Sequence, residues 1–366
     1  MTPRFIRSHQ NRRSRLSVVA ALAAATLVIT GCTSTDSQPT ASPSPGSTVT
    51  LVTYDSYLIS DETLAAFTEQ TGVNVDVVRA GDGGQIVNRA ILTKDNPEGD
   101  VLFGVDNNLL SRALSNDLFQ PYQPAAISEV PQEFVDGTDG VVTPIDTGDV
   151  CINIDKAGLA QRDLDPPQSL DDLTDPAYRG LLVVENPATS TPGLAFLLTT
   201  VDRYGADGFT DYWQKLADNE VVVENSWDSA YYQRFSGGSG EGKLPLVVSY
   251  ASSPAAEVIF AEKPPKTAPT TALLDSCYRQ VEYAGLLAGA ANPAGGQALL
   301  DFMLTPTYQD DLPLNNFVYP VLPTAEVPAE FDKYAPKPTA PAQLPAAEVD
   351  ANREGWVEQW TAVVQP

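Results

Sequence analysis

Four short apolar runs, each followed by polar residues and then by a helical pattern, constrain the fold more than any other feature of this sequence. They begin at Thr50, Val101, Leu181 and Leu246. Continuous apolar runs of this length are typical of strands buried on both faces of a parallel sheet. Because strands and helices alternate, we expect an α/β protein with open, doubly wound sheets. Ligands of such sheets bind beyond the carboxyl ends of the strands, where the polar residues follow.

The predicted helices have recognisable ends. One begins after Ser60, where two acidic residues follow, and stops at Gly72. Further helices are predicted over 85–92, 294–304 and 350–364. The last of these carries a single apolar stripe at positions i, i+4, i+7 and i+8, formed by Trp356, Trp360, Val363 and Val364.

The N-terminus has the pattern of an export signal. Residues 4–15 carry five arginines and no acid, and 16–29 form an apolar stretch that is short for a membrane span. The stretch ends in Ile29-Thr30-Gly31-Cys32, which resembles the lipobox of bacterial lipoproteins. We therefore expect a lipoprotein signal peptide over 1–32 that ends at an acylated Cys32, and localisation at the cell membrane, lipid-anchored on its extracytoplasmic face. An ordinary cleaved signal is the alternative.

A Ser/Thr/Pro linker over 33–47 follows, too polar to bury a core, and is expected to tether the domain to the membrane.

The whole sequence has 22 Lys and Arg against 47 Asp and Glu, a net charge of −25. Removal of 1–32 would take five arginines and no acid, leaving −30. Such acidity excludes a nucleic-acid partner, whose binding needs a basic face. It suits a cationic ligand, although acidic surfaces also serve solubility.

Cysteine and histidine usage narrows the chemistry further. With Cys32 acylated, Cys151 and Cys277 remain, and in an exported protein this pair is expected to form a disulfide; two separate buried thiols are the alternative. The one histidine, His9, lies in the predicted signal. The mature chain therefore lacks the histidine of Ser-His-Asp and Cys-His sites and of many metal centres. We expect no catalytic residue, no metal and no cofactor.

Several residues have the chemistry of ligand contacts. The cluster 189–193 is predicted to open a helix, whose free N–H groups can hold a phosphate or hydroxyl, although capping alone also explains it. Asp82, in a Gly-rich loop, can neutralise a cation or act as a turn residue. Aromatic rings stack on flat groups and attract organic cations. Those beside polar clusters are Tyr54, Tyr57, Trp227, Tyr231, Tyr232, Tyr250, Phe317 and Tyr319.

From about residue 48 to the C-terminus, the chain resembles the thiamine-binding proteins of bacterial ABC importers. Seven segments carry the resemblance in family order: Thr53-Tyr54-Asp55-Ser56-Tyr57, Gly104-Val105-Asp106-Asn107-Asn108-Leu109-Leu110, Pro166-Pro167-Gln168-Ser169-Leu170, Thr189-Ser190-Thr191-Pro192-Gly193-Leu194, Ser226-Trp227-Asp228-Ser229-Ala230-Tyr231, Ser249-Tyr250-Ala251-Ser252-Ser253-Pro254 and Tyr319-Pro320-Val321. The second and fourth segments together are fairly specific to this family.

The resemblance implies the type II periplasmic-binding-protein fold, with two α/β lobes, a central ligand cleft and two crossing strands. Lobe 1 would take 48–144 and 282–366, and lobe 2 would take 145–281, with crossing segments at 146–149 and 280–282. It also implies a monomeric solute-binding protein that captures thiamine, a thiamine phosphate or a related pyrimidine cation and delivers it to the permease subunits of an ABC importer.

Six residues would form the ligand site by this resemblance: Tyr54, Asp82, Ser190, Trp227, Tyr250 and Phe317. The tyrosines and Trp227 would wall and close the pocket, and Asp82 would accept from or neutralise the thiamine head. Ser190 would lie at the hydroxyethyl or phosphate end. Phe317 stands where the family often has Trp, which keeps a stacking face.

The sequence departs from the family at two aromatic positions. Leu58-Ile59-Ser60-Asp61 stands where the family has a Trp shortly after Asp-Ser-Phe, and Ala255-Ala256 replaces a Tyr that follows Ser-Pro. Two aromatic walls are therefore missing, which leaves another flat cation open as the cargo.

Two other classes share this fold. A ferric-ion receptor is one, because the adjacent Tyr231 and Tyr232 resemble the tyrosine pair that binds iron in such proteins; packing of one ring and exposure of the other to the cleft is the simpler interpretation. A thiaminase-like enzyme with a Cys nucleophile is the other, and a disulfide between Cys151 and Cys277 would remove its thiolate.

Overall fold

The structure, a computed structural model, describes residues 42–365. The predicted signal peptide, the acylated Cys32 and the first part of the linker lie outside the described residues. The described end of the linker, 42–47, has no regular structure, but the backbone N–H of Gly46 donates to the carbonyl of Gly72 at 2.7 Å. Within 42–365, none of the helices is both long and apolar enough for a bilayer span.

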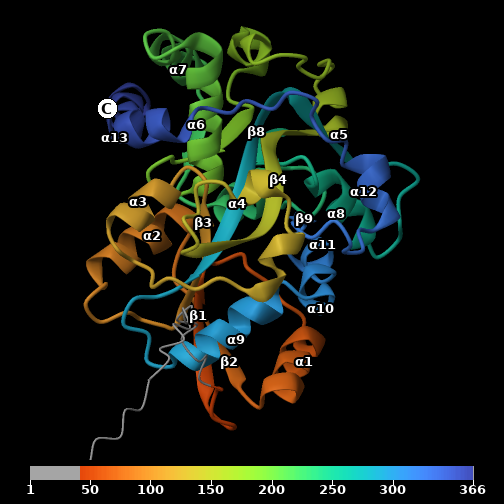
Figure 1. Cartoon of the computed structure of the whole chain (residues 1–366). Helices are drawn as coiled ribbons and strands as arrows, with labels where there is room; N and C mark the ends of the chain where they lie inside the picture. Colours follow the sequence, from red (N-terminus) through yellow and green to blue (C-terminus); the bar gives the residue numbers. More distant parts are fainter. Residues whose placement is uncertain (1–41, 366) are drawn as a thin grey trace, which may run out of the picture. The chain divides into compact units, whose positions relative to one another are not determined.

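Nine strands form a single hydrogen-bonded sheet in the order β2-β1-β3-β8-β4-β7-β5-β6, with β9 paired to β4 (Figure 1). The strands are β1 (Thr48–Thr53), β2 (Asn74–Arg79), β3 (Val101–Asp106), β4 (Val142–Asp155), β5 (Leu182–Glu185), β6 (Val222–Glu224), β7 (Leu246–Tyr250), β8 (Thr270–Leu286) and β9 (Tyr319–Pro320). The four strands predicted from apolar runs correspond to β1, β3, β5 and β7.

The sheet is mixed, whereas the sequence pattern indicated parallel sheets. β1 is parallel to β2 and β3, and β5 is parallel to β6 and β7. Between these two parallel groups run the longest strands, β4 and β8, which pair antiparallel with each other and with their outer neighbours. Both carry buried polar residues, such as Asp146 and Gln280, that interrupt any apolar run. Periodicity therefore did not reveal their full length.

Helices cover both faces of the sheet (Figure 1). They are α1 (Asp61–Thr71), α2 (Gly83–Leu92), α3 (Leu110–Ser115), α4 (Gln132–Val135), α5 (Lys156–Ala160), α6 (Thr191–Tyr204), α7 (Phe209–Asp218), α8 (Ser253–Ile259), α9 (Pro293–Met303), α10 (Pro306–Gln309), α11 (Leu312–Asn315), α12 (Ala329–Tyr334) and α13 (Ala346–Val364). A π-helical turn spans Ser229–Arg234.

The predicted helix ends agree with the structure where capping chemistry marks them. The Ser60 hydroxyl accepts from the Thr63 N–H at 3.1 Å, and Gly72 ends α1 with φ of +71°. The apolar stripe of α13 is also confirmed, because Trp356 and Trp360 are buried. Trp360 meets Trp213 of α7 edge to face, with ring centroids 5.6 Å apart. α12 packs against α8, so the C-terminal segment contacts elements from the middle of the chain.

A disulfide joins Cys151 of β4 to Cys277 of β8, as predicted from the even cysteine count. Their Cα atoms are 4.2 Å apart. It lies beside a shift of the β4–β8 register between Val150 and Ile152. Because both sulfurs are engaged, residues 42–365 contain no cysteine thiolate, and the thiaminase-like alternative loses its nucleophile.

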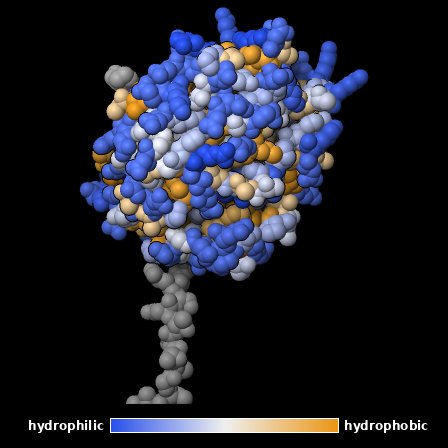
Figure 2. Space-filling model, turned by 90° about the horizontal axis from the view of Figure 1, so that it is seen from above, coloured by the Kyte–Doolittle hydropathy of each residue, from blue (hydrophilic) through white to orange (hydrophobic). Residues whose placement is uncertain are grey.

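The face of the domain seen in Figure 2 is mainly polar. Figure 2 shows hydrophilic residues across the face in view, with hydrophobic residues in small, separated groups. Scattered apolar residues of this kind are normal on soluble domains.

Candidate ligand-binding site

Two adjoining cavities lie at the carboxyl ends of several strands. The smaller has a volume of about 60 Å³ and the larger one of about 510 Å³. Both are lined by Trp227, Tyr232, Ser253 and Phe317. The larger volume is in the range of small-molecule sites. We therefore treat the two cavities as one candidate site.

Five of the six predicted site residues line the smaller cavity: Tyr54, Asp82, Trp227, Tyr250 and Phe317. They come from the ends of β1, β2 and β7 and from the segments before the π-helical turn and β9. Ser190 is not among the residues that line it, but its neighbours Thr191 and Pro192 are. The structure thus brings together residues from distant parts of the sequence at the sheet edge where ligands were expected.

Hydrogen bonds fix the aromatic walls. The Tyr54 hydroxyl donates to Glu282 at 3.3 Å, and the Tyr250 hydroxyl donates to Gln280 at 2.9 Å. The Trp227 indole N–H donates to the Ser249 hydroxyl at 3.0 Å. A ring held in one orientation loses little freedom when a flat ligand stacks on it.

Two glycines make room for these rings. A Cβ atom at Gly104, where φ is +103°, would collide with the Tyr54 ring, and one at Gly148 would lie 2.9 Å from the Tyr250 ring. Neither position can take a larger residue without moving its tyrosine. The segment 104–110, which carries much of the family resemblance, therefore contributes to the site through its backbone.

Asp82 holds two segments together. It caps α2, where its carboxylate accepts from the Gly83 N–H at 2.6 Å, and it also accepts from the backbone N–H of Trp227 at 2.9 Å. Burial raises the pKa of Asp82 to about 6, against the lowering effect of these two hydrogen bonds. Near neutral pH the carboxylate is therefore mainly ionised. The sequence left Asp82 as either a turn residue or a partner for a cation; in the structure it is a helix N-cap that also lines the smaller cavity.

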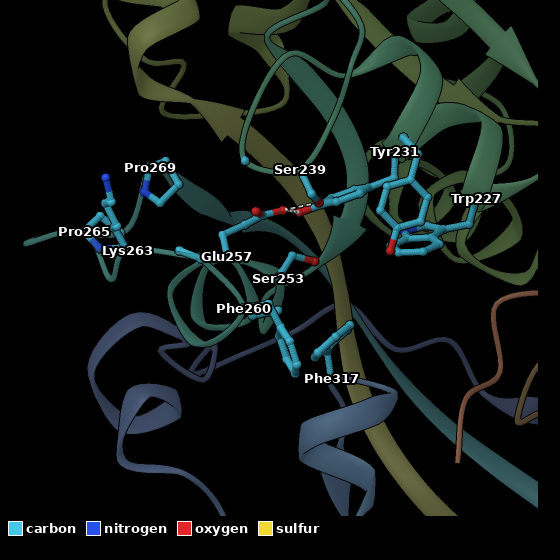
Figure 3. A pocket seen from close by; sticks show the side chains of 14 residues that line it. Trp227, Tyr231, Ser239, Ser253, Glu257, Phe260, Lys263, Pro265, Pro269 and Phe317 are labelled. Atoms are coloured by element: carbon cyan, nitrogen blue, oxygen red, sulfur yellow. Dashed lines mark hydrogen bonds between the residues drawn. The ribbon is translucent and has the colours of Figure 1, made fainter. Parts of the chain in front are cut away.

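Phe317 has an unusual backbone. Its φ is +58°, a conformation that residues other than Gly seldom adopt. Its ring lines both cavities and meets the Phe260 ring edge to face, with centroids 5.2 Å apart (Figure 3). Backbone strain of this kind is concentrated at binding and active sites.

Ser190 does not line the smaller cavity. It is 1% exposed and lines a different cavity, together with Gly84, Leu194 and Arg353. Its hydroxyl is close enough to lower the pKa of Asp82, although it makes no hydrogen bond of normal geometry to any of residues 42–365. A residue at the N-cap can direct its side chain to either side of the helix end, and the sequence does not reveal which.

Sequence reasoning missed three carboxyl groups next to the smaller cavity. Glu282 of β8 lines it, and Asp106 and Asp146 are the register partners of Glu282 on the neighbouring strands β3 and β4. All three residues are buried. In the sequence, these three acids could have been noticed because apolar residues surround each of them. Their position side by side, however, follows only from the register of the strands.

Burial makes these groups hard to ionise. It raises the pKa of Asp106 to about 6 and, together with the charge of Asp106, that of Glu282 to about 8. Burial and the nearby Glu282 hold the pKa of Asp146 well above its usual range. At neutral pH Glu282 and Asp146 therefore keep protons that carboxyl groups ordinarily lose, whereas Asp106 is mainly ionised.

Both tyrosines of the pair considered for iron line the larger cavity, but they differ in burial. Tyr231 is buried, stacks on Trp227 with centroids 4.8 Å apart, and donates to Glu257 at 2.6 Å (Figure 3). Tyr232 is 39% exposed and lines both cavities. The expected division of one packed ring and one cavity ring therefore holds only in part, because the packed Tyr231 also lines the larger cavity. In the part of the chain that the structure describes, no cluster of three or more His, Cys, Asp or Glu residues is arranged to hold a metal ion.

A mixed α/β fold with an aromatic and acidic cavity at the strand ends defines a receptor for small molecules. The model of the bacterial extracellular solute-binding protein family matches residues 96–350. The thiamine-binding periplasmic protein of Escherichia coli (strain K12) is 33% identical over 321 residues, which cover 86% of this chain and 93% of that protein. That of Brucella suis biovar 1 is 32% identical over 324 residues, covering 86% and 91%.

A solved periplasmic thiamin binding protein has the same fold, with a TM-score of 0.77 at 32% identity over 88% of this chain and 99% of that one. The chain belongs to the family of bacterial extracellular solute-binding proteins. It is therefore an extracytoplasmic binding protein and not an enzyme. The type II periplasmic-binding-protein fold expected from the sequence is confirmed.

Proposed function

We propose that this protein captures thiamine, or a thiamine phosphate or related pyrimidine cation, and delivers it as a monomer to the permease subunits of an ABC importer. One observation carries the proposal. Five aromatic residues and the carboxyl groups of Asp82 and Glu282 line one cavity, in a chain similar over most of its length to proteins named for thiamine binding.

The chemistry of the cavity suits thiamine. Thiamine joins a flat aminopyrimidine to a positively charged thiazolium ring. A cation over an aromatic face gains about 0.5–2 kcal/mol per ring. Micromolar affinity requires about 8 kcal/mol in total, so a few rings and a carboxylate are sufficient contacts. Ala256 lines the larger cavity where the family has a Tyr nearby, which leaves space for a bulkier ligand.

Calorimetry with protein purified without refolding tests the proposal. We expect saturable heat with thiamine at micromolar concentrations, and native mass spectrometry should identify any ligand that copurifies. Absence of heat at millimolar thiamine would reject this cargo and leave only the receptor class. The ferric alternative, which Tyr232 at the cavity keeps open, predicts a visible charge-transfer band on addition of Fe³⁺.

Asp82→Asn is expected to weaken thiamine binding while sparing a neutral pyrimidine analogue. Asparagine caps a helix about as well as aspartate, so α2 should remain intact. What is lost is the negative charge and one of the two acceptor oxygens. Calorimetry of both ligands measures the effect. Asp228→Asn is the control, because this neighbouring carboxyl does not line the cavities, and equal losses in the two variants would contradict the assignment.

We further propose that the domain works as two lobes, 48–144 with 282–366 and 145–281. The sheet order supports this division, since β4 and β8 lie between two parallel groups of strands. On this division Asp82 and Trp227 belong to different lobes, and their hydrogen bond would report closure. The packing of α12 and α13 on α8 and α7 would tie the C-terminal segment to the second lobe.

Lipid anchoring through Cys32 completes the proposal. It is supported by Ile29-Thr30-Gly31-Cys32 and the polar linker that follows. Cys32→Ala should abolish acyl labelling and release the protein from the membrane fraction, whereas Thr33→Ala, one residue further on, should change neither. A Cys32→Ala protein that stays in the membrane fraction to the same extent would disprove the anchor.

A further inference from the structure

Three carboxyl groups form a row across neighbouring strands beside the smaller cavity. Glu282 on β8 is the register partner of Asp106 on β3 and of Asp146 on β4. We call these residues the acid row. Directly opposite residues on adjacent strands have Cβ atoms about 4.5–5.5 Å apart, and like charges in such pairs repel. The exposed fractions are 0% for Asp106, 1% for Asp146 and 6% for Glu282.

The acid row has few partners that would stabilise negative charge. Within 42–365, both carboxyl oxygens of Asp146 are buried without a hydrogen bond. In the same part of the chain, Glu282 accepts only from the Tyr54 hydroxyl. Asp106 is better supported, since it accepts from the side chain of Asn108 at 3.0 Å and from two backbone N–H groups. An unpartnered buried carboxyl is far more costly when ionised than when protonated.

The charged surroundings offer little compensation. Among residues 42–365, the titratable groups that face Glu282 and Asp146 are acids and tyrosines: Asp82, Tyr54, Tyr57, Tyr250 and Tyr308. Within the acid row, Arg353 lowers the pKa of Asp106 and not that of Glu282 or Asp146. Arg279 is engaged by Asp149, with a nitrogen–oxygen distance of 2.6 Å. A positive charge that would allow Glu282 to ionise at neutral pH must therefore come from a ligand in the cavity.

We propose that the acid row selects ligands with a permanent positive charge, and that binding such a cation displaces one proton from Glu282 to solvent. Glu282 is the member that lines the cavity, so its carboxylate would face the bound cation, while Asp146 behind it stays protonated. The positive charge of the bound cation replaces that of the released proton, so the net charge of the site is unchanged. The O–H bond of Glu282 is the one bond that breaks. A cation with aromatic contacts is favoured over a compact metal ion, for which the described residues offer no ligand cluster.

The raised pKa of Glu282, about 8, sets the conditions for a test. This inference rests on the proposed function for the identity of the cation, so thiamine is the ligand in the titrations. Titrations at pH 7 in phosphate and in Tris, whose ionisation heats differ, should show release of nearly one proton per bound thiamine. Between pH 6.5 and 7.5 the affinity should rise by up to about tenfold per pH unit, since the proton leaves on binding.

Glu282→Gln keeps the shape of the side chain and removes the titrating group. We expect it to abolish proton release and flatten the pH dependence, so that affinity at pH 8.5 falls at least tenfold while affinity at pH 6.5 changes little. A purely structural role would lower affinity equally at both values. Asp301→Asn is the matched control: burial also raises the pKa of this carboxyl, but it lines neither cavity. It should behave as the wild type.

The outcomes separate this inference from the proposed cargo. Thiamine binding without proton release by the wild type, or with undiminished release by Glu282→Gln, overturns the role of the acid row and leaves thiamine as the cargo. The wild-type measurement decides alone if the variant does not fold. If thiamine does not bind, the cargo is wrong, and choline becomes the probe. Proton release on choline binding then supports the acid row, and its absence at tens of millimolar choline overturns it.

Discussion

Replacing Cys151 and Cys277 together with alanine is expected to lower the free energy of unfolding by as much as about 5 kcal/mol. The disulfide closes a loop with a sequence separation of 126 residues, and a loop of this length greatly restricts the unfolded chain. Alanine is preferred to serine because both cysteines are buried, and a serine hydroxyl there would need a partner. Denaturant unfolding of the oxidised wild type and the double variant measures the difference.

A reducing agent provides the internal control. It should lower the stability of the wild type to that of the double variant and leave the double variant unchanged. A double variant within 1 kcal/mol of the oxidised wild type would show that the disulfide restricts the unfolded chain much less than the chain-entropy model indicates. Because the bond joins β4 to β8, its loss should loosen the central pair of strands first.

Trp227→Ala is expected to weaken thiamine binding at least tenfold, which corresponds to about 1.4 kcal/mol. The indole lines both cavities, and its loss removes a stacking face and the contact that holds Tyr231 and Tyr232 in place. Calorimetry with thiamine measures the effect. An affinity within threefold of the wild type would place the ligand elsewhere.

Tyr204→Ala is the matched control for this variant. Tyr204 stacks on Tyr212 with centroids 4.5 Å apart, much as Trp227 stacks on Tyr231, but it lines neither cavity. Loss of this ring should lower stability and leave thiamine affinity unchanged. A comparable loss of affinity in both variants would indicate general loosening of the domain rather than a ligand contact.

Local chemistry explains which elements could be predicted from the sequence. Ser60 and Gly72 mark the ends of α1 because a capping hydroxyl and a left-handed residue are local requirements. The apolar runs predicted β1, β3, β5 and β7 because burial on both faces leaves a continuous pattern. β4 and β8 were only partly foreseen, as crossing segments, because their polar residues are buried by contacts with distant strands.

The same distinction applies to the candidate site. Tyr54, Asp82 and Tyr250 follow or end strands, so their convergence could be foreseen from the fold class. The acid row could not, because Asp106, Asp146 and Glu282 become neighbours only through strand register. The direction of the Ser190 side chain likewise depends on how the start of α6 packs, which the sequence does not specify.

The placement of the four tryptophans gives this protein a built-in optical reporter. Trp213, Trp356 and Trp360 are at most 4% exposed and belong to one hydrophobic cluster, so their emission should stay constant when ligand enters. Trp227 alone among the four lines the cavities. A change in intrinsic fluorescence can therefore be assigned to the site without a label. A library of flat organic cations can be ranked by this signal in the unmodified protein.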